Sequence, residues 1–139
     1  MYSYAKISLT TLLIGFLLSM APPFNFVQEG EASYYADQLK GNPTASGAPY
    51  HPDSLTAAHR YLPMGTEILV TNTANQRQVS VIVNDRGPFH PDRIVDVSYR
   101  AADSLGIVDA GVGTVTIQAQ LPADVVEQLQ EQINASTKQ

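Results

Sequence analysis

Short segments rich in β-branched residues, each followed by turn residues, succeed one another through most of this chain. The clearest two are TEILVTN (66–72) and RQVSVIVN (77–84), which the turn TANQ joins. Alternating apolar and polar residues in such segments are typical of strands with one buried face. RIVDVS (93–98) and GTVTIQAQ (113–120) continue the pattern. Strands this short, without a regular alternation of strands and helices, favour a small closed β-barrel over an open parallel sheet.

Two segments have helical periodicity instead. In SYRAADSLG, Ser98 is suited to cap a short helix and Gly106 to end it. In the tail PADVVEQLQEQINASTKQ, apolar residues recur along one helical face. They are Val125, Val126, Leu129 and Ile133. The pattern leaves open whether this helix packs on the barrel or forms a weakly ordered extension. We assign residues 30–120 to the barrel and residues 121–139 to a C-terminal helical extension.

The beginning of the chain has the layout of a secretory signal. Lys6 and the free amine precede an apolar run over residues 7–18, and small and helix-breaking residues follow. A stable membrane span needs about 20 apolar residues, so the shorter run favours a cleaved signal over a retained anchor. We expect a signal peptide over residues 1–21 and a linker over residues 22–29. The chain is then exported to the periplasm or cell envelope.

Composition excludes several classes of protein. The sequence has no cysteine, which excludes a thiol nucleophile, a thiolate metal site and a lipid anchor attached to cysteine. The formal net charge of −5 argues against binding to nucleic acid or to anionic membranes. A neutral sugar polymer remains compatible with this charge.

Common catalytic motifs are also missing. The sequence contains no G-x-S-x-G, no H-E-x-x-H and no phosphate-binding G-x-x-x-x-G-K-[ST] motif. The three histidines are His51, His59 and His90, and no two of them are four residues apart. A zinc site built from them with Asp85 is therefore disfavoured. We expect neither a metal ion nor another cofactor.

Acid–base chemistry by a carboxylate or an imidazole remains. Asp85 follows a predicted strand, and Gly87-Pro88 gives the chain a stiff exit beside Phe89. A carboxylate that Pro88 and Phe89 partly shield from water can act as a general acid. The residues alone fit a turn cap better, because aspartate in turns commonly accepts backbone hydrogen bonds. His59 has a similar alternative as a buried, hydrogen-bonded ring.

Four segments together resemble one known family. GEASYYA, GNPTASG, LTAAHRYLPMGTEILVTNTANQRQVSVIVNDRGPF and RIVDVSYRAADSLG have the order and spacing of the rare lipoprotein A family. Members of this family are septal-ring lytic transglycosylases, with a fold related to that of expansins. The resemblance covers about residues 30–119. It implies a mainly β fold: a six-stranded double-psi β-barrel with one short helix and a C-terminal helical tail.

The resemblance also implies a reaction and a set of residues. The family cleaves the MurNAc–GlcNAc β-1,4 bond of peptidoglycan without water and leaves a 1,6-anhydro-MurNAc end, with no cofactor. Its catalytic residues fall on Asp85 and His59, and Asp85 would protonate the glycosidic oxygen and then accept the proton of the C6 hydroxyl. The residues implied for substrate binding are Tyr34, Tyr35, Thr44, His51, Asn84 and Arg86. The implied partners are glycan strands and cell-division or envelope proteins, with the chain acting as a monomer.

The sequence departs from the family at two acidic positions. Ala48 and His51 stand where members usually carry Glu and Asp, and Tyr34-Tyr35 replaces a Trp-Tyr pair. A second function therefore stays open, namely a non-catalytic, expansin-like module that binds glycan or loosens the wall. Retention of Asp85 favours the enzyme, whereas loss of the two acids favours the module.

Overall fold

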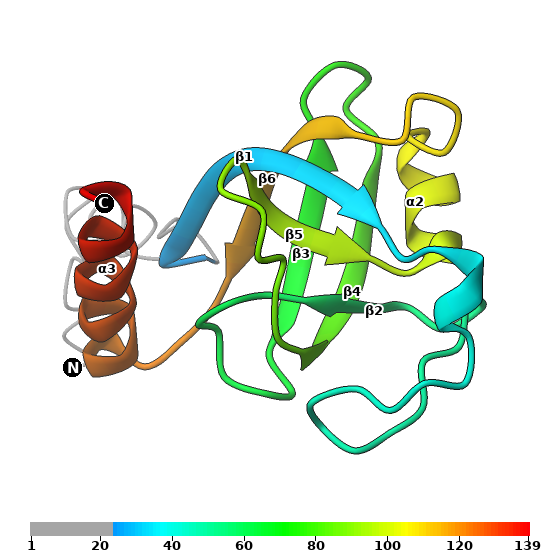
Figure 1. Cartoon of the computed structure of the whole chain (residues 1–139). Helices are drawn as coiled ribbons and strands as arrows, with labels where there is room; N and C mark the ends of the chain where they lie inside the picture. The colour runs from blue at the N-terminus through cyan, green and yellow to red at the C-terminus, as the bar shows by residue number, and fades with distance from the viewer. Residues whose placement is uncertain (1–23) are drawn as a thin grey trace, which may run out of the picture.

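Six strands close into a barrel in the computed structural model, which describes residues 24–139 (Figure 1). The order of neighbouring strands is β1-β5-β2-β4-β3-β6. The strands are β1 (Phe26–Tyr34), β2 (Thr56–Ala58), β3 (Glu67–Asn72), β4 (Gln78–Asp85), β5 (Arg93–Val97) and β6 (Gly113–Ala119). A 3-10 turn η1 (Asp37–Leu39) and the helices α2 (Tyr99–Leu105) and α3 (Ala123–Thr137) complete the fold. The predicted six-stranded double-psi β-barrel is confirmed. The predicted signal peptide lies outside the described residues.

Strand pairing mixes the two directions. The pairs β1·β5 and β2·β4 are parallel, and the other four neighbouring pairs are antiparallel. Strands that are adjacent in the barrel are thus often distant in sequence. Each parallel pair has an irregularity in its register, one at Ala32 and one at Ala58. Such irregularities bend a strand and increase its twist, which assists closure of a small barrel.

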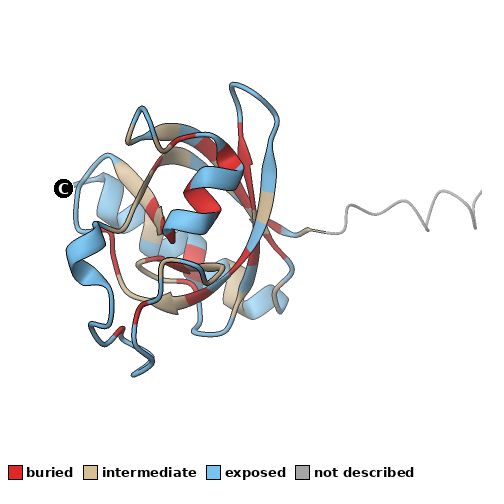
Figure 2. Ribbon diagram, turned by 90° about the vertical axis from the view of Figure 1, so that its right-hand side faces the viewer, coloured by how far each residue is buried: buried red, intermediate tan, exposed pale blue. Residues whose placement is uncertain are grey.

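Alternate residues of the strands fill the barrel, as the period of two requires. Seven apolar residues at alternate strand positions are almost completely buried. They are Ile68, Val70, Val81, Val83, Val95, Val115 and Ile117. Val79, at an alternate position of the same strand as Val81 and Val83, is only partly buried and packs against the core. Figure 2 shows buried positions on the barrel strands and on one side of α2.

Both helices follow the sequence pattern. Ser98 accepts a hydrogen bond from the backbone of Ala101, and Gly106 ends α2 in the left-handed region at a φ of 73°. In α3, Leu129 is buried, and the other apolar residues of the same face pack against the core. The question left open by the sequence is therefore answered: α3 lies against the barrel near the beginning of β1 (Figure 1). None of the helices between residues 24 and 139 is long and apolar enough to cross a membrane.

One predicted boundary is wrong. The linker expected over residues 22–29 overlaps β1, which begins at Phe26 and pairs there with Ala119 of β6. Phe26 is buried in the core. The segment from Gln28 to Gly30 contains residues with weak strand propensity, so its strand structure depends on pairing with β6 rather than on local preference. The barrel thus begins four residues before the predicted start at residue 30.

The packing of α3 can be tested by replacing Leu129 with alanine. Removing this buried side chain should lower the free energy of unfolding by about 2–4 kcal/mol, the range for Leu→Ala in a core. The exposed neighbour Gln128, replaced by alanine, is the matched control and should leave stability within about 0.5 kcal/mol. Urea unfolding monitored by circular dichroism gives both values. Equal stability of the two variants would show that α3 is not docked.

Candidate active site

The registers of four strands set a row of residues on the outer face of the barrel. Ser33 of β1 pairs with Asp96 of β5, and Asp96 pairs with Ala58 of β2. Ala58 pairs in turn with Asp85 at the end of β4. Directly paired residues point to the same face of a sheet, and Asp96 faces outward because its neighbours Val95 and Val97 are buried. The two aspartates lie two strand spacings apart, roughly 10 Å between Cα atoms.

The Asp85 carboxylate accepts three hydrogen bonds. The Tyr35 hydroxyl donates at 2.7 Å, the backbone N–H of Ala45 at 2.8 Å and the backbone N–H of Arg86 at 2.9 Å. The bond from Arg86 is local and matches the turn-cap alternative. The other two donors lie 50 and 40 residues away in sequence, so they fix the carboxylate against the rest of the fold. Asp85 is therefore more than a turn cap: it is a positioned acceptor.

Tyr35 is hydrogen-bonded to Asp85 and lies within electrostatic range of Asp96. Burial raises the pKa of its hydroxyl, and the hydrogen bond to Asp85 and the charge of Asp96 raise it further. The hydroxyl therefore stays protonated and donates a hydrogen bond to Asp85. Its ring stacks on Tyr50, with 4.4 Å between centroids and 26° between planes. The structure thus brings the sequence-predicted Tyr35 to the site, where its ring already packs against another aromatic residue.

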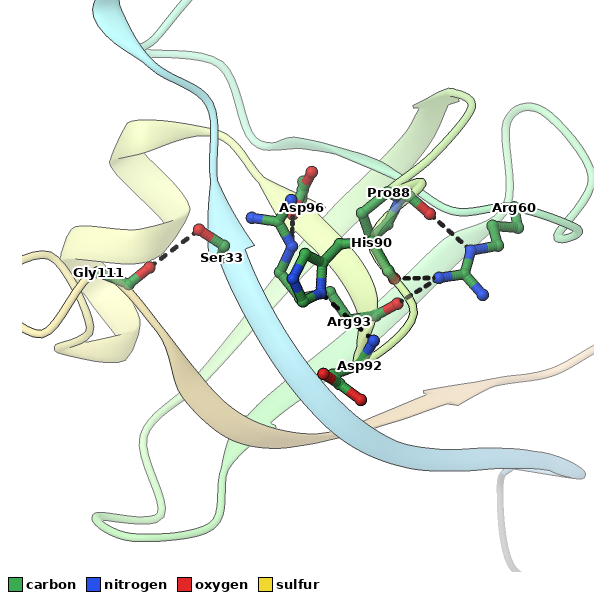
Figure 3. A network of polar contacts seen from close by, with 8 residues as sticks. All are labelled: Ser33, Arg60, Pro88, His90, Asp92, Arg93, Asp96 and Gly111. Atoms are coloured by element: carbon green, nitrogen blue, oxygen red, sulfur yellow. Dashed lines mark hydrogen bonds and ion pairs between the residues drawn. The ribbon is translucent and has the colours of Figure 1, made fainter. Parts of the chain in front are cut away.

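Asp96 is the acidic residue that the sequence analysis missed. Burial raises the pKa of its carboxyl, although Arg93, His90 and Arg60 oppose the shift. Its Oδ1 atom is 3.8 Å from Nε of Arg93, and neither atom has a hydrogen-bond partner among the described residues. Figure 3 shows this pair beside Ser33. The sequence did offer a signal for Asp96, namely an acid between two apolar valines in RIVDVS. The sequence does not show which strands pair with this one, so it could not place Asp96 near Asp85.

His59 lies close to Asp85 only through the backbone. Its N–H donates to the Asp85 carbonyl at 3.2 Å, while its ring is buried and points elsewhere. Nδ1 accepts from the backbone N–H groups of Tyr61 and Leu62, so Nε2 carries the proton and donates to Gln28 at 2.9 Å. Burial, with Arg86 and Arg60 nearby, lowers the pKa of His59 to about 4. A neutral ring with every hydrogen bond satisfied holds the loop 59–62 in place.

Three other predicted residues support loops around Asp85. The Arg86 guanidinium donates to the carbonyls of His59 and Leu62, at 3.1 and 2.8 Å. Thr44 is buried, and its hydroxyl donates to the Ala48 carbonyl at 2.7 Å. The Asn84 carbonyl accepts from the backbone of Ser46, which ties the loop 40–52 to β4, and Asn84 Oδ1 is buried without a partner in the described chain.

The structure does not bring two predicted residues to this site. Tyr34 points to the opposite side of β1 from Tyr35, where its hydroxyl donates to Val108 and its ring contacts Tyr99 edge-on. His51 is exposed, and its Nδ1 accepts from the backbone of Asp53. Within residues 24–139, no three His, Asp or Glu side chains form a group that could hold a metal ion.

The chain has a closed double-psi β-barrel with two aspartates and a tyrosine on its outer face. It therefore belongs to the class of double-psi β-barrel proteins. The comparisons assign this chain within that class. It belongs to the lytic transglycolase family, because that family's model matches residues 27–117.

Similar proteins carry related names. The "Endolytic peptidoglycan transglycosylase RlpA" of Vibrio cholerae is 46% identical over 69% of this chain and 36% of its own length. The protein of the same name from Neisseria meningitidis serogroup A is 46% identical over 70% of this chain and 41% of its own. The chain thus spans well under half the length of these curated relatives.

Solved structures support the fold. The Streptomyces papain inhibitor superimposes with a TM-score of 0.57 at 25% identity, covering 71% of this chain and 98% of the inhibitor. An expansin of Clavibacter michiganensis gives 0.54 at 25% identity, covering 70% and 52%. Proteins with different names share this barrel, so the fold alone does not determine activity.

The buried neutral state of His59 predicts a dependence of stability on pH. His59 binds a proton near pH 6.5 in the unfolded chain but only near pH 4 in the folded chain. The contribution of neutral His59 to stability is therefore fully present above pH 6.5 and decreases as the pH falls. The loss due to His59 between pH 6.5 and pH 5 should be about 1.5 kcal/mol. Urea unfolding at both values measures it in the parent chain and in His59→Gln. The parent should lose about 1.5 kcal/mol more than the variant, since every other titrating group is common to both. Equal losses would contradict a buried neutral ring.

Proposed function

We propose that this chain is an exported peptidoglycan lytic transglycosylase that cleaves the MurNAc–GlcNAc β-1,4 bond and leaves 1,6-anhydro-MurNAc ends. The observation that carries the proposal is the strand register that places Asp96, whose carboxyl pKa is raised by burial, on the same face as Asp85, whose carboxylate is held by the Tyr35 hydroxyl and the Ala45 backbone. Membership of the lytic transglycolase family and the names of the relatives support the reaction.

The two aspartates divide the proton transfers. Asp96 donates its proton to the glycosidic oxygen, and the bond from that oxygen to C1 of MurNAc breaks. The C6 hydroxyl of the same sugar attacks C1, and Asp85 accepts the hydroxyl proton. Because the sugar supplies its own nucleophile, no water is consumed, in contrast to ordinary glycosidases. Exchange with solvent returns the proton from Asp85 to Asp96. On sequence alone, both steps were assigned to Asp85.

His59 and Arg86 act as positioning residues in this scheme. Both hold the loop 59–62, and His59 also fixes the end of β4 through its backbone N–H. Tyr35 orients the Asp85 carboxylate.

The assignments outside the site are also proposals: a signal peptide over residues 1–21, action in the periplasm or cell envelope, no lipid anchor, a monomeric chain, and envelope or division proteins as partners.

An expansin-like, non-catalytic glycan-binding module is the alternative function. Ala48 and His51 in place of two acids favour it, as does the likeness to an expansin. Mass spectrometry of purified peptidoglycan after incubation separates the two functions. Anhydro-ended fragments that appear only with the protein support the enzyme, and binding without such fragments supports the module.

The division of roles predicts the effects of two substitutions. Asp85→Asn and Asp96→Asn should each keep the fold and lower the release of anhydro-ended fragments by about 10²-fold or more, the scale for losing a general acid or base. Asp92→Asn is the control, since Asp92 is exposed on the loop 86–92. Release rates are measured by mass spectrometry, with circular dichroism as the check on folding.

The outcomes distinguish the schemes. Loss in Asp85→Asn alone would return both proton steps to Asp85. Parent rates in both folded variants would refute catalysis by this pair. Since burial raises the pKa of Asp96, activity should fall as pH rises through that pKa, and the fall should be absent from the residual activity of Asp96→Asn.

A further inference from the structure

Phe89 is far more exposed than any other large apolar side chain in residues 24–139. It is 86% exposed, whereas the next most exposed, Val27, reaches 53%. A ring this exposed contributes little to the shielding of Asp85 expected from Pro88 and Phe89. The ring lies over Gly87, two residues from Asp85: a Cβ atom built on Gly87 would be 3.5 Å from Phe89 Cε2.

The loop that carries Phe89 is firmly held. Arg60 donates through Nε to the Pro88 carbonyl at 2.5 Å, and through Nη2 to the carbonyls of His90 and Arg93 (Figure 3). The residues before the ring, Gly87 and Pro88, are both buried. An arginine that bonds carbonyls on both sides of Phe89 fixes the backbone of the loop, from which the ring projects into solvent. An exposed aromatic ring on an anchored loop, four residues after the proposed catalytic carboxylate of Asp85, is suited to bind a ligand that lies across the site.

We infer that Phe89 is a stacking platform for a pyranose ring of the glycan strand, in a sugar unit next to the bond that is cleaved. This inference rests on the proposed function. The apolar C–H face of a pyranose ring packs on an aromatic face, and a neutral sugar face suits a chain with a net charge of −5.

A protein partner or a second copy of the chain fits the surface less well. A stable interface buries about 800 Å² per partner, with an apolar centre. Phe89 is a single ring, and the polar, exposed residues His90 and Asp92 stand close by on the same loop. One ring is enough for one sugar, and much too small for such an interface.

The test compares Phe89→Ala with Phe89→Tyr, which keeps the ring. Phe89→Ala should raise KM for long glycan strands about 10-fold, the scale of one aromatic contact, and leave kcat nearly unchanged, because the platform holds substrate and transition state alike. Phe89→Tyr should keep KM within about 2-fold. Val112→Ala, which trims an exposed apolar side chain elsewhere, is the control. Circular dichroism confirms that all three variants fold.

Cosedimentation with purified peptidoglycan measures binding without turnover, which separates this inference from the proposed function. Fragment release with equal binding and KM in Phe89→Ala overturns the platform and leaves the enzyme standing. Weaker binding of Phe89→Ala in a chain that releases no fragments supports the platform and overturns the enzyme. A parent chain that binds no strands overturns the platform. A dimer of the parent chain, seen by analytical ultracentrifugation, would also overturn the platform if Phe89→Ala abolishes the dimer and leaves glycan binding unchanged.

Discussion

The hydrogen-bonded register of β2 is the constraint on which the site depends. This strand has only three residues, yet it pairs with β4 on one side and β5 on the other, and Ala58 lies between Asp85 and Asp96. A slip of one residue in either pairing would change which side chains share the outer face, since successive residues point to opposite faces. On β5 such a slip would direct Asp96 into the apolar core. The same pairing that closes the barrel therefore assembles the two carboxylates.

The side chains and backbone groups around β2 support the site in two different ways. Tyr35 and the backbone of Ala45 act on the Asp85 carboxylate directly. His59 and Arg86 act on the chain instead, because they satisfy the backbone of the loop 59–62, which follows β2. A charged imidazole could not accept those backbone bonds, so the low pKa of His59 and the geometry of the loop depend on each other. An arrangement fixed in this way holds the Asp85 carboxylate in place.

Periodicity and turn residues were sufficient to predict most of the fold. Local pattern identified the buried valines of β4, the cap at Ser98 and the apolar face of α3, because each depends on residues near it in sequence. Asp85 was found because a charged residue in a stiff turn is conspicuous. Asp96 was missed, and Tyr34 was grouped with Tyr35, because only pairing between strands decides which face a residue occupies. The beginning of β1 was missed for the same reason: β6 imposes it.

The two missing family acids bear less on Asp85 than the sequence suggested. Ala48 and His51 both lie exposed on the loop 40–52, and that loop reaches Asp85 through a backbone N–H, that of Ala45. A backbone donor is present whatever side chains the loop carries. The loop is held in turn by the bond from the Thr44 hydroxyl to the backbone carbonyl of Ala48 and by the bond from Ser46 to the Asn84 carbonyl, and neither bond uses a side chain at a replaced position. The support of the Asp85 carboxylate is thus independent of the lost acids, which favours an enzyme over a module that only binds glycan.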